Sequence, residues 1–485
     1  MTQGKEISRR SFLGAAMAGA ALVGLEGTRL ARAAAALEDG SASRPNILFI
    51  LIDDAGYTDL SYTGTALEFY GSDYHETPNL DGLAREGMLF KSAYMHPNCA
   101  PSRGCLMTGQ NTPRHGIYTV NTGKRGAEED RKVEPPPTET ALSQDTSTVA
   151  EVLRDAGYFT AHLGKWHLGD PDTHGPEQQG FDVNIGGYSA GHPPSGYFPP
   201  YQNPYLEDGP EGEYLPDRLA DEAIGLIREH RDEPFFIYLA HHAPHTPIQA
   251  KEEDVERYQQ REPGKYHDHP EYAAMIHAID ENVGRILSTL NELDLRDNTV
   301  VVFSSDNGPH EGYSNALPFR GSKGTLYEGG IRVPLLVRWP GVVEPGSVCE
   351  EPVQHIDFYP TLAEIAGAEI PGGHEVDGES FAPLLKSGGE GELGRDALFW
   401  HFPGYLEAYR PQLGPWRTTP VTVMRAGEWK LMEFYEDNRL ELYNLDYDPY
   451  EQNDLSRGLP DKVEELHAKM RAWREEVNAP IPEPK

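Results

Sequence analysis

Cysteine is scarce in this 485-residue sequence, which contains only three. Three cysteines cannot build the disulfide framework of a small secreted scaffold, so that class of protein is excluded. Basic residues are also few, since 42 lysines and arginines face 77 aspartates and glutamates and leave a net charge of −35. So acidic a protein repels phosphate backbones, and we therefore exclude nucleic acid as a partner. An anionic substrate would need a local basic pocket.

Long apolar runs are missing as well. No segment stays apolar over the roughly 18 residues that a membrane-spanning helix needs, so we do not expect an integral membrane protein. Hydrophobic residues still make up 38% of the chain. That share is enough to bury a sizeable core, and it excludes a wholly disordered protein.

The first 33 residues have the features of a targeting signal. Paired arginines in residues 8–13 (SRRSFL) precede an apolar stretch at 12–25, and residues 31–33 (ARA) form a candidate cleavage site. This order is typical of a twin-arginine signal peptide, although an uncleaved anchor or a chance alanine-rich start is the alternative. We therefore predict that residues 1–33 engage the twin-arginine export machinery and that the protein is exported, to the periplasm or outside the cell.

Apolar runs alternate with helical patterns along most of the chain. Runs that suit strands buried on both faces occur at residues 46–52, 234–240 and 299–303, with weaker candidates at 158–163 and 333–339. Helical spacing of apolar residues occurs at 148–156, 217–230, 272–293 and 357–366. This alternation predicts an α/β fold with a large, mostly parallel or mixed sheet flanked by helices.

The C-terminal part has a different pattern. Short strand signals at residues 421–425, 428–433 and 439–444 precede a helix at 461–477, which predicts a smaller subdomain with an antiparallel sheet and a helix. We place the catalytic domain at residues 44–374 and the C-terminal subdomain at 375–485. Two long polar segments, 125–145 and 169–212, are expected to be loops that either shape a binding site or are insertions.

Chemically active residues follow four of the predicted strands. They are the pair Asp53 and Asp54, the segment 164–169 (GKWHLG), the segment 241–245 (HHAPH), and the pair Asp306 and Asn307. Ligands bind at the carboxyl ends of strands in open α/β sheets, so we expect these residues to share one site. Clustered carboxylates need a cation, and their hard oxygen donors favour Ca²⁺ or Mg²⁺ over zinc. The alternative is that the two acidic motifs are a helix cap and a turn.

The segment 99–103 (CAPSR) combines a nucleophile with an anion site. Proline and serine suit the first turn of a helix, and a helix N-terminus favours anions and lowers the pKa of a thiol. Arg103 adds planar donors for an oxyanion. This predicts a nucleophile at Cys99 in an anion-binding site. The alternative is a buried structural cysteine in a proline turn.

Residues 99–109 (CAPSRGCLMTG) resemble the signature of the sulfatase family, within the alkaline-phosphatase-like superfamily. Asp53 and Asp54 resemble the family's metal pair, and Asp306 and Asn307 its remaining metal ligands. Residues 164–169 resemble its second signature. Residues 244–247 (PHTP) resemble its leaving-group histidine region, and 321–334 its lysine-bearing loop. The resemblance covers roughly residues 44–457.

This resemblance implies a chemistry for each position. A formylglycine-generating enzyme would convert Cys99 to formylglycine, and a Ca²⁺ ion, with Mg²⁺ possible, would be bound by residue 99 and by the four ligands Asp53, Asp54, Asp306 and Asn307. Arg103, Lys165 and Lys323 would neutralise the sulfuryl oxygens. His245, with Lys323, would protonate the leaving oxygen, and His167 would take a proton from residue 99 as sulfate departs. The substrate would be a small-molecule or glycan sulfate ester, a carbohydrate or aryl sulfate, cleaved to alcohol and inorganic sulfate.

Several alternatives remain open from the sequence. His241 or His242 is a rival for the proton donor, and Lys165 and Lys323 are surface charges in the alternative view. The aromatic loop 188–205 with His192, and residues 400–403 with His401, are candidates to border the leaving-group pocket. The rival enzyme is a phosphonate monoester or phosphodiester hydrolase of the same superfamily. The rival from another class is a catalytically silent protein that binds sulfated glycans.

Overall fold

The computed structural model describes residues 44–485, and residues 45–485 form one compact unit. The predicted signal peptide at residues 1–33 lies outside the described residues. Among the described residues, no helix is both long and apolar enough to cross a lipid bilayer.

An eight-stranded mixed sheet forms the centre of the unit, in the order β11-β2-β10-β8-β1-β7-β5-β6. Its parallel part comprises β8 (Thr299–Ser305), β1 (Asn46–Ile52), β7 (Phe235–Ala240), β5 (Phe159–Gly164) and β6 (Val183–Ile185). The antiparallel strand β10 (Leu335–Arg338) joins β8 to β2 (Met88–Phe90) and β11 (Ser347–Cys349). Every residue of β1 and β8 is buried, as expected for strands covered on both faces. The predicted mixed α/β sheet is therefore confirmed.

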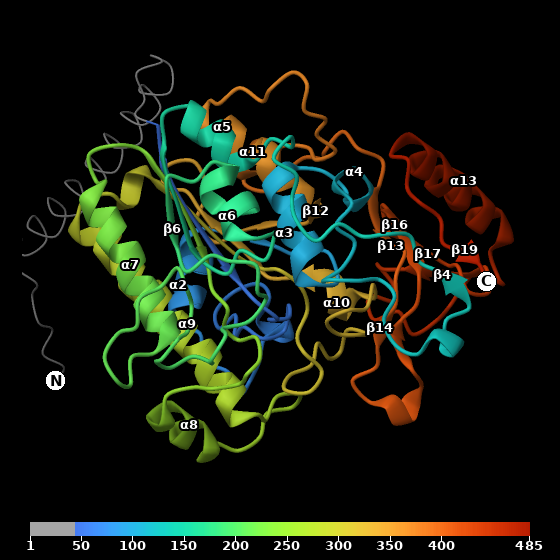
Figure 1. Ribbon diagram of the computed structural model, residues 1–485, viewed down its shortest axis with the longest axis horizontal. Helices are drawn as coiled ribbons and strands as arrows, with labels where there is room; N and C mark the ends of the chain where they lie inside the picture. The colour runs from blue at the N-terminus through green and yellow to red at the C-terminus, as the bar shows by residue number, and fades with distance from the viewer. Residues whose placement is uncertain (1–43) are drawn as a thin grey trace, which may run out of the picture. The chain divides into compact units, whose positions relative to one another are not determined.

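Alternate side chains of β1 face two separate cores. Ile47, Phe49 and Leu51 pack with α3 (Cys99–Thr108), α5 (Val149–Asp155) and α11 (Phe358–Ala366). Leu48, Ile50 and Ile52 pack on the other side with α2 (Pro78–Glu86), α7 (Leu215–Glu229) and α9 (Pro270–Glu292). Figure 1 shows these two helix layers on opposite sides of the sheet. Helix α5 begins with a capping box between Thr148 and Glu151, as its predicted start at Thr148 requires.

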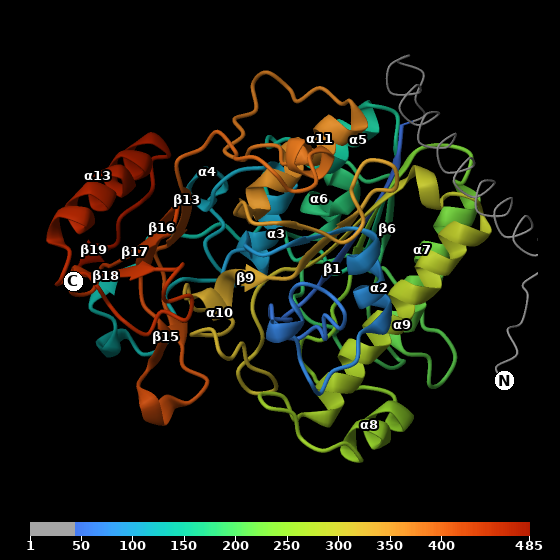
Figure 2. The ribbon, with the colours of Figure 1, turned by 180° about the vertical axis from the view of Figure 1, so that it is seen from behind.

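The smaller C-terminal sheet is antiparallel, in the order β13-β16-β17-β18. Its strands are β13 (Leu398–Phe402), β16 (Val421–Ala426), β17 (Trp429–Phe434) and β18 (Arg439–Asn444). Helix α13 (Pro460–Glu476) covers one face, where Leu466 and Met470 pack with Met424 and Leu431 (Figure 2). The three predicted strands and the predicted helix are confirmed, whereas β13 was not predicted.

The segments predicted as loops contain short elements. Residues 125–145 include β4 (Val133–Glu134), which pairs with β19 (Glu483–Pro484). Residues 169–212 include α6 (Pro171–His174) and the sheet-edge strand β6. The remaining short elements are α4 (Thr112–His115), α8 (Glu252–Gln259), α10 (Glu328–Ile331), α12 (Ala382–Lys386), β3 (Ala93–Tyr94), β9 (Arg332–Val333), β12 (Val353–Gln354), β14 (Leu406–Glu407) and β15 (Trp416–Thr418).

The placement of His401 on β13 corrects one prediction. Its side chain is buried, with 1% exposed. Nδ1 lies 2.8 Å from the Thr422 hydroxyl, and Nε2 lies 3.0 Å from the Pro480 carbonyl. Both ring nitrogens therefore bond inside the subdomain, and the expectation that His401 borders the leaving-group pocket is wrong.

A buried ionic group links the small sheet to α10. The ammonium of Lys430 lies 2.9 Å from a Glu328 oxygen and 2.8 Å from a Glu451 oxygen, and all three residues are fully buried. Burial, reinforced by the Glu328 charge, raises the pKa of Glu451 to about 7, although Lys430 acts in the opposite direction. Two carboxylates thus compete for one ammonium in a fully buried site.

We predict that this group makes stability fall as the pH rises. The pKa of Glu451 in the folded state lies above its ordinary value of 4.5, so the folded state retains a proton that the unfolded chain releases. The contribution is complete below pH 4.5 and is lost as the pH rises to about 7, with a magnitude on the order of 3 kcal/mol. Glu451→Gln should flatten the dependence of the unfolding free energy on pH between 5 and about 8. Denaturant unfolding at several pH values measures this dependence. Glu475→Gln is the control, because Glu475 is exposed. Parallel curves for Glu451→Gln and the parent would contradict the prediction.

Candidate active site

Four parallel strands deliver the predicted site residues to one edge of the sheet. Leu51 pairs with Ala240, Ala240 with Gly164, and Ile52 with Ser305. The residues that follow these positions are Asp53 and Asp54, His241, Lys165, and Asp306 and Asn307, so they emerge side by side. The expectation that the four strand ends share a site follows from this register.

The acidic residues form a single buried cluster. The Asp54 backbone amide donates to Asp306 at 3.3 Å, and the Asn307 side-chain amide donates to Asp54 at 2.8 Å. Ligand atoms of Asp53, Asp306 and Cys99 lie within 4.8 Å of one another. Asp54 adopts a left-handed conformation with φ of 66°, which turns the chain sharply between the two neighbouring carboxylates.

Two oxygens of this cluster suit a hard cation. Asp53 Oδ1 and Asn307 Oδ1 are buried, and neither has a hydrogen-bond partner among residues 44–485. Burial and the nearby Asp306 charge raise the pKa of Asp53 well above its ordinary value. Burial acts in the same direction on Asp54, but Lys323, His245 and Lys165 together outweigh it and hold the pKa of Asp54 low. Oxygen donors of this kind, close together and unsatisfied, match the preferences of Ca²⁺ or Mg²⁺.

Cys99 is the first residue of helix α3, as its position before the proline and serine predicted. The turn is fixed by Ser102, whose hydroxyl donates to the His96 carbonyl at 3.0 Å and accepts from the His96 amide at 3.0 Å. The helix ends at Gly109, which has a left-handed φ of 67°. Only 2% of Cys99 is exposed. Burial raises the pKa of its thiol, and Lys165 and Lys323 do not offset this, so the expected lowering of that pKa is wrong.

Three buried cations balance the three carboxylates. Arg103 donates from Nε and Nη2 to Asp306 at 3.1 and 2.9 Å, and from Nη1 to the Lys165 carbonyl at 2.8 Å. The Lys165 ammonium bonds to Asp53, and the Lys323 ammonium lies 2.6 Å from Asp54. The Lys165 side chain is 0% exposed and that of Lys323 is 11% exposed. The alternative that these lysines are surface charges is therefore wrong.

The balance has a consequence for ligand charge. The formal charges of these six side chains sum to zero, whereas the whole chain has a net charge of −35. A divalent cation added at this place would leave a surplus of positive charge, which favours an anionic substrate and a negatively charged nucleophile.

His245 faces the carboxylates from the loop after β7. Its Nδ1 lies 2.8 Å from the Thr246 carbonyl, which only accepts, so Nδ1 carries the hydrogen. Its Nε2 lies 3.7 Å from Asp54. Burial, and then Lys323, lower the pKa of His245 well below its ordinary value. The rivals His241 and His242 are fully buried, and their ring nitrogens have no hydrogen-bond partner in the described part of the chain.

His167 lies beneath the aromatic loop. Its backbone is left-handed with φ of 63°, and its amide donates to the Tyr188 carbonyl at 3.1 Å. A Cβ added to Gly191 would lie 2.4 Å from the His167 ring, so the loop passes directly over the imidazole. His192 is exposed on this loop, and its carbonyl accepts from the Tyr188 hydroxyl at 3.0 Å. The loop thus borders the site, although no contact of the His192 ring shows a binding role.

Three residues near Lys323 were not predicted. The Arg417 guanidinium lies 3.9 Å from the centre of the Tyr409 ring, and the Tyr409 and His310 rings are 4.1 Å apart. A Cβ on Gly324 would lie 2.4 Å from Arg417 Nε. Arg417 belongs to β15 of the C-terminal subdomain, and only tertiary packing brings it to the lysine loop. No local sequence signal could have found it.

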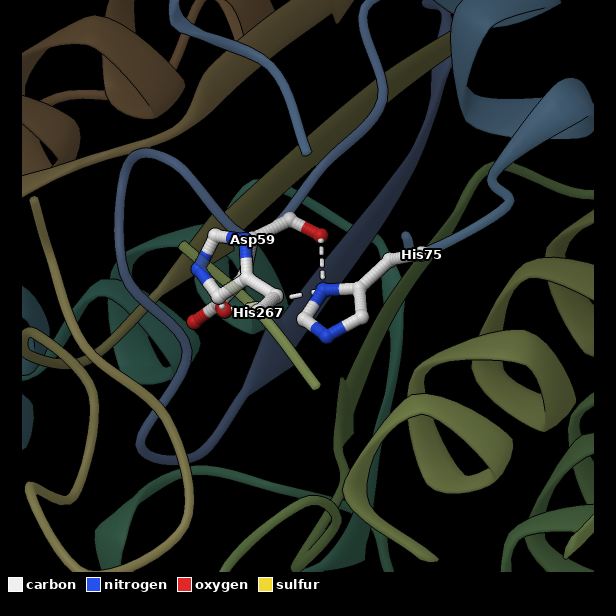
Figure 3. Close-up of side chains that lie close together, drawn as sticks. All are labelled: Asp59, His75 and His267. Carbon is white, nitrogen blue, oxygen red and sulfur yellow. Dashed lines mark hydrogen bonds and ion pairs between the residues drawn. The ribbon is translucent and has the colours of Figure 1, made fainter. Parts of the chain in front are cut away.

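A second group of metal-type side chains contains Asp59, His75 and His267 (Figure 3). His75 Nδ1 lies 2.9 Å from the Asp59 carbonyl, so that nitrogen carries a hydrogen and cannot bind a metal. The Asp59 carboxylate already accepts from the Ser314 hydroxyl at 2.6 Å and the Tyr272 hydroxyl at 2.9 Å. The Tyr272 hydroxyl also contacts the Asp54 carbonyl at 3.0 Å. This group therefore supports the loop that carries the aspartate pair.

A family comparison agrees with this geometry, since the sulfatase profile matches residues 45–368. The chain belongs to the sulfatase family. A second profile, N-sulphoglucosamine sulphohydrolase C-terminal, matches residues 321–478. Family membership makes the chain a sulfuric ester hydrolase.

Curated relatives and solved structures support the same assignment. A sulfatase of Formosa agariphila is 34% identical, covering 90% of each chain, and the N-acetylgalactosamine-6-sulfatase of Homo sapiens is 35% identical, covering 72% of this chain and 67% of that protein. The crystal structure of Ps i-CgsB in complex with k-i-k-neocarrahexaose is 31% identical, with a TM-score of 0.73 over 89% of this chain and 93% of that one. The phosphonate monoester hydrolase of Agrobacterium radiobacter, at 21% identity and a TM-score of 0.67 over 90% of this chain and 96% of that one, shares the fold.

Proposed function

We propose that this sulfatase hydrolyses a sulfate ester of a carbohydrate to an alcohol and inorganic sulfate, using formylglycine at position 99 and a Ca²⁺ ion. The observation that carries this proposal is the convergence of Cys99, Asp53 and Asp306 within 4.8 Å at the start of α3, beside Arg103. A carbohydrate is supported by the saccharides named for the human relative and for the neocarrahexaose complex.

The residues present fit the two groups that this chemistry requires. Asp53, Asp54, Asp306 and Asn307 would hold the ion, and their unpartnered buried oxygens support that role. When bound, the cation would polarise the sulfuryl group, and the aldehyde of formylglycine, after adding water, would provide one hydroxyl as nucleophile and a second from which sulfate can be released. Ca²⁺ is the proposed ion because its flexible coordination suits a set of carboxylate and amide oxygens, and Mg²⁺ is the alternative.

The cations of the site would bind and orient the sulfate. Arg103 is held by two bonds to Asp306 and one to the Lys165 carbonyl, so its guanidinium is fixed before substrate arrives. Lys165 and Lys323 place two further charges beside the same carboxylates. Charges fixed in advance stabilise the oxygens on which charge develops, because no reorganisation is needed during the reaction.

Two histidines would move protons in this proposal. His245 Nε2 and the Lys323 ammonium both approach Asp54. Because the hydrogen of the neutral His245 ring is on Nδ1, the proton would come from the Lys323 ammonium and pass through His245 Nε2 to the leaving oxygen. His167 would take a proton from residue 99 as sulfate leaves, and its buried Nδ1 has no partner within residues 44–485. His192 is proposed at the entrance, because its loop covers His167.

We predict that His245→Ala lowers turnover of a sugar sulfate by about 10²- to 10⁴-fold. The loss should be smaller for 4-nitrophenyl sulfate, because nitrophenolate leaves without needing a proton. Sulfate release from both substrates by the parent and the variant measures the difference. His241→Ala is the control, since it removes a neighbouring buried imidazole whose nitrogens have no partner among the described residues. Turnover equal to the parent would refute the assignment of His245.

A direct comparison of substrates tests the proposed function. Turnover should be higher on 4-nitrophenyl sulfate than on a nitrophenyl ester of phenylphosphonate. A preference for the phosphonate would favour the rival hydrolase. Binding of a sulfated glycan without release of sulfate, by protein that carries formylglycine, would favour the silent binding protein.

We also propose that residues 1–33 direct export and that residues 44–374 and 375–485 act as catalytic domain and C-terminal subdomain. The twin arginines support the first statement, and the separate antiparallel sheet supports the second. Cell fractionation after replacing Arg9 and Arg10 by lysine tests export.

A further inference from the structure

Arg417 is a partly buried arginine for which no carboxylate partner is found among residues 44–485. Its Nε and Nη1 atoms are buried and have no hydrogen-bond partner among residues 44–485, and no ion pair is found for it there. Nearby arginines differ, since Arg410 pairs with Glu311 at 3.2 Å and Arg320 donates to the Tyr443 hydroxyl at 2.9 Å. Two buried guanidinium nitrogens without an acceptor are unfavourable, so they favour a ligand that supplies the missing anion.

The position of Arg417 places that ligand beside the sulfate site. Its Nε would lie 2.4 Å from a Cβ on Gly324, the residue after Lys323, so any side chain at position 324 would displace the guanidinium. Lys323 is the residue whose ammonium lies 2.6 Å from Asp54. The Tyr409 ring lies between Arg417 and His310. The guanidinium is therefore a neighbour of the lysine loop.

A cavity of about 820 Å³ opens at the same place. Its lining includes Arg417 and the aromatic rings of Tyr409, Trp416 and Tyr450. Aromatic faces stack on sugar rings, and the planar fork of an arginine matches a carboxylate or a sulfate. Glu311 also lines the cavity, but it is already paired with Arg410.

We propose that Arg417 binds a second anionic group of the substrate, a sulfate or carboxylate on the saccharide that carries the scissile sulfate. The substrate class is then a polyanionic saccharide. This inference rests on the proposed sulfatase function. A polyanion would be repelled by a chain of net charge −35, so an extra cation beside the reacting group is what such a substrate requires.

The test uses three matched disaccharides with the same scissile sulfate. One has no other charge, one has a second sulfate, and one has a carboxylate. For the parent, kcat/KM should be higher for one of the dianionic substrates than for the monoanionic one. The selectivity ratio is kcat/KM for the preferred dianionic substrate divided by kcat/KM for the monoanionic one. Arg417→Gln should reduce this ratio by about 10- to 100-fold, the range expected for a charge-assisted contact. Arg417→Lys should restore part of it, and the preferred dianion identifies the second group.

Arg471→Gln is the matched control, because it removes an arginine of the same subdomain that lies 3.0 Å from its Glu464 partner and does not line the cavity. Its ratio should equal that of the parent. An unchanged ratio in Arg417→Gln, an equal loss on all three substrates, or a parent that prefers the monoanion would overturn the proposal.

A binding measurement separates this proposal from the proposed function. Calorimetric titration of the disulfated disaccharide into Cys99→Ala and into Cys99→Ala with Arg417→Gln does not depend on turnover. Affinity should be about 10- to 100-fold weaker without Arg417. Equal affinities would overturn the role of Arg417. A clear difference in a protein that cleaves no sulfate ester would support it while contradicting the proposed function.

Discussion

Cys99→Ala should lose at least about 10⁴-fold in sulfate release, because the variant retains the binding groups but has no nucleophile. The structure places residue 99 at the start of α3, buried, with its sulfur among the ligand atoms of Asp53 and Asp306. Initial rates with 4-nitrophenyl sulfate, at protein concentrations high enough to detect the residual activity, measure the loss.

Serine at position 99 gives a sharper result than alanine. Cys99→Ser retains a hydroxyl that can attack sulfur, but it has no second hydroxyl from which the aldehyde can re-form. The variant should therefore accumulate a sulfated serine, about 80 Da heavier, after a single turnover. Cys105→Ala is the control, since Cys105 is buried six positions further along the same helix with its sulfur 3.2 Å from His115. Multiple turnovers by Cys99→Ser would contradict the proposed release step.

Asp306→Asn should lower turnover by about 10³-fold or more, because this carboxylate has two roles. It accepts two of the three hydrogen bonds that orient Arg103, and it lies among the proposed ligands of the cation. An asparagine of the same size would weaken both interactions and leave Arg103 buried with a neutral partner. Turnover measured across a Ca²⁺ titration should not recover at high Ca²⁺.

Thermal unfolding measures independently whether Asp306 is a ligand of the cation. Ca²⁺ should raise the Tm of the parent, because an ion that binds only the folded state stabilises it, and Asp306→Asn should lose most of that shift. Asp280→Asn is the matched control. Asp280 is fully buried and accepts from the Leu80 amide at 2.8 Å, far along the chain from the cluster. An Asp306→Asn variant that keeps the parent's Ca²⁺-dependent shift would exclude this position as a ligand.

The central strands could be predicted because their signal is local. Residues 46–52 are continuously apolar and are followed by two aspartates, so both ends of β1 were predicted correctly. The site residues at the strand ends followed from the parallel topology, in which the carboxyl ends meet at one edge. The weak strands β6 and β13 were missed, because they are short or carry polar residues inside a small sheet.

Other features depend on tertiary packing and could not be predicted from local patterns in the sequence. His401 is a polar residue in an aromatic segment, which suggested a pocket, yet its ring nitrogens bond to Thr422 and Pro480. The pKa of Cys99 was expected to be lowered by the helix terminus, but burial dominates and raises it. Arg417 reaches the lysine loop from a hairpin in the other subdomain, and no spacing in the sequence records that contact.

Mass spectrometry of the tryptic peptide 92–103 tests the central claim most directly. The peptide ends at Arg103 and contains residue 99 as its only cysteine. In protein that releases sulfate, the peptide should be about 18 Da lighter than its cysteine form, because formylglycine replaces the thiol with an aldehyde. An active preparation in which this peptide carries only unmodified cysteine would contradict the account.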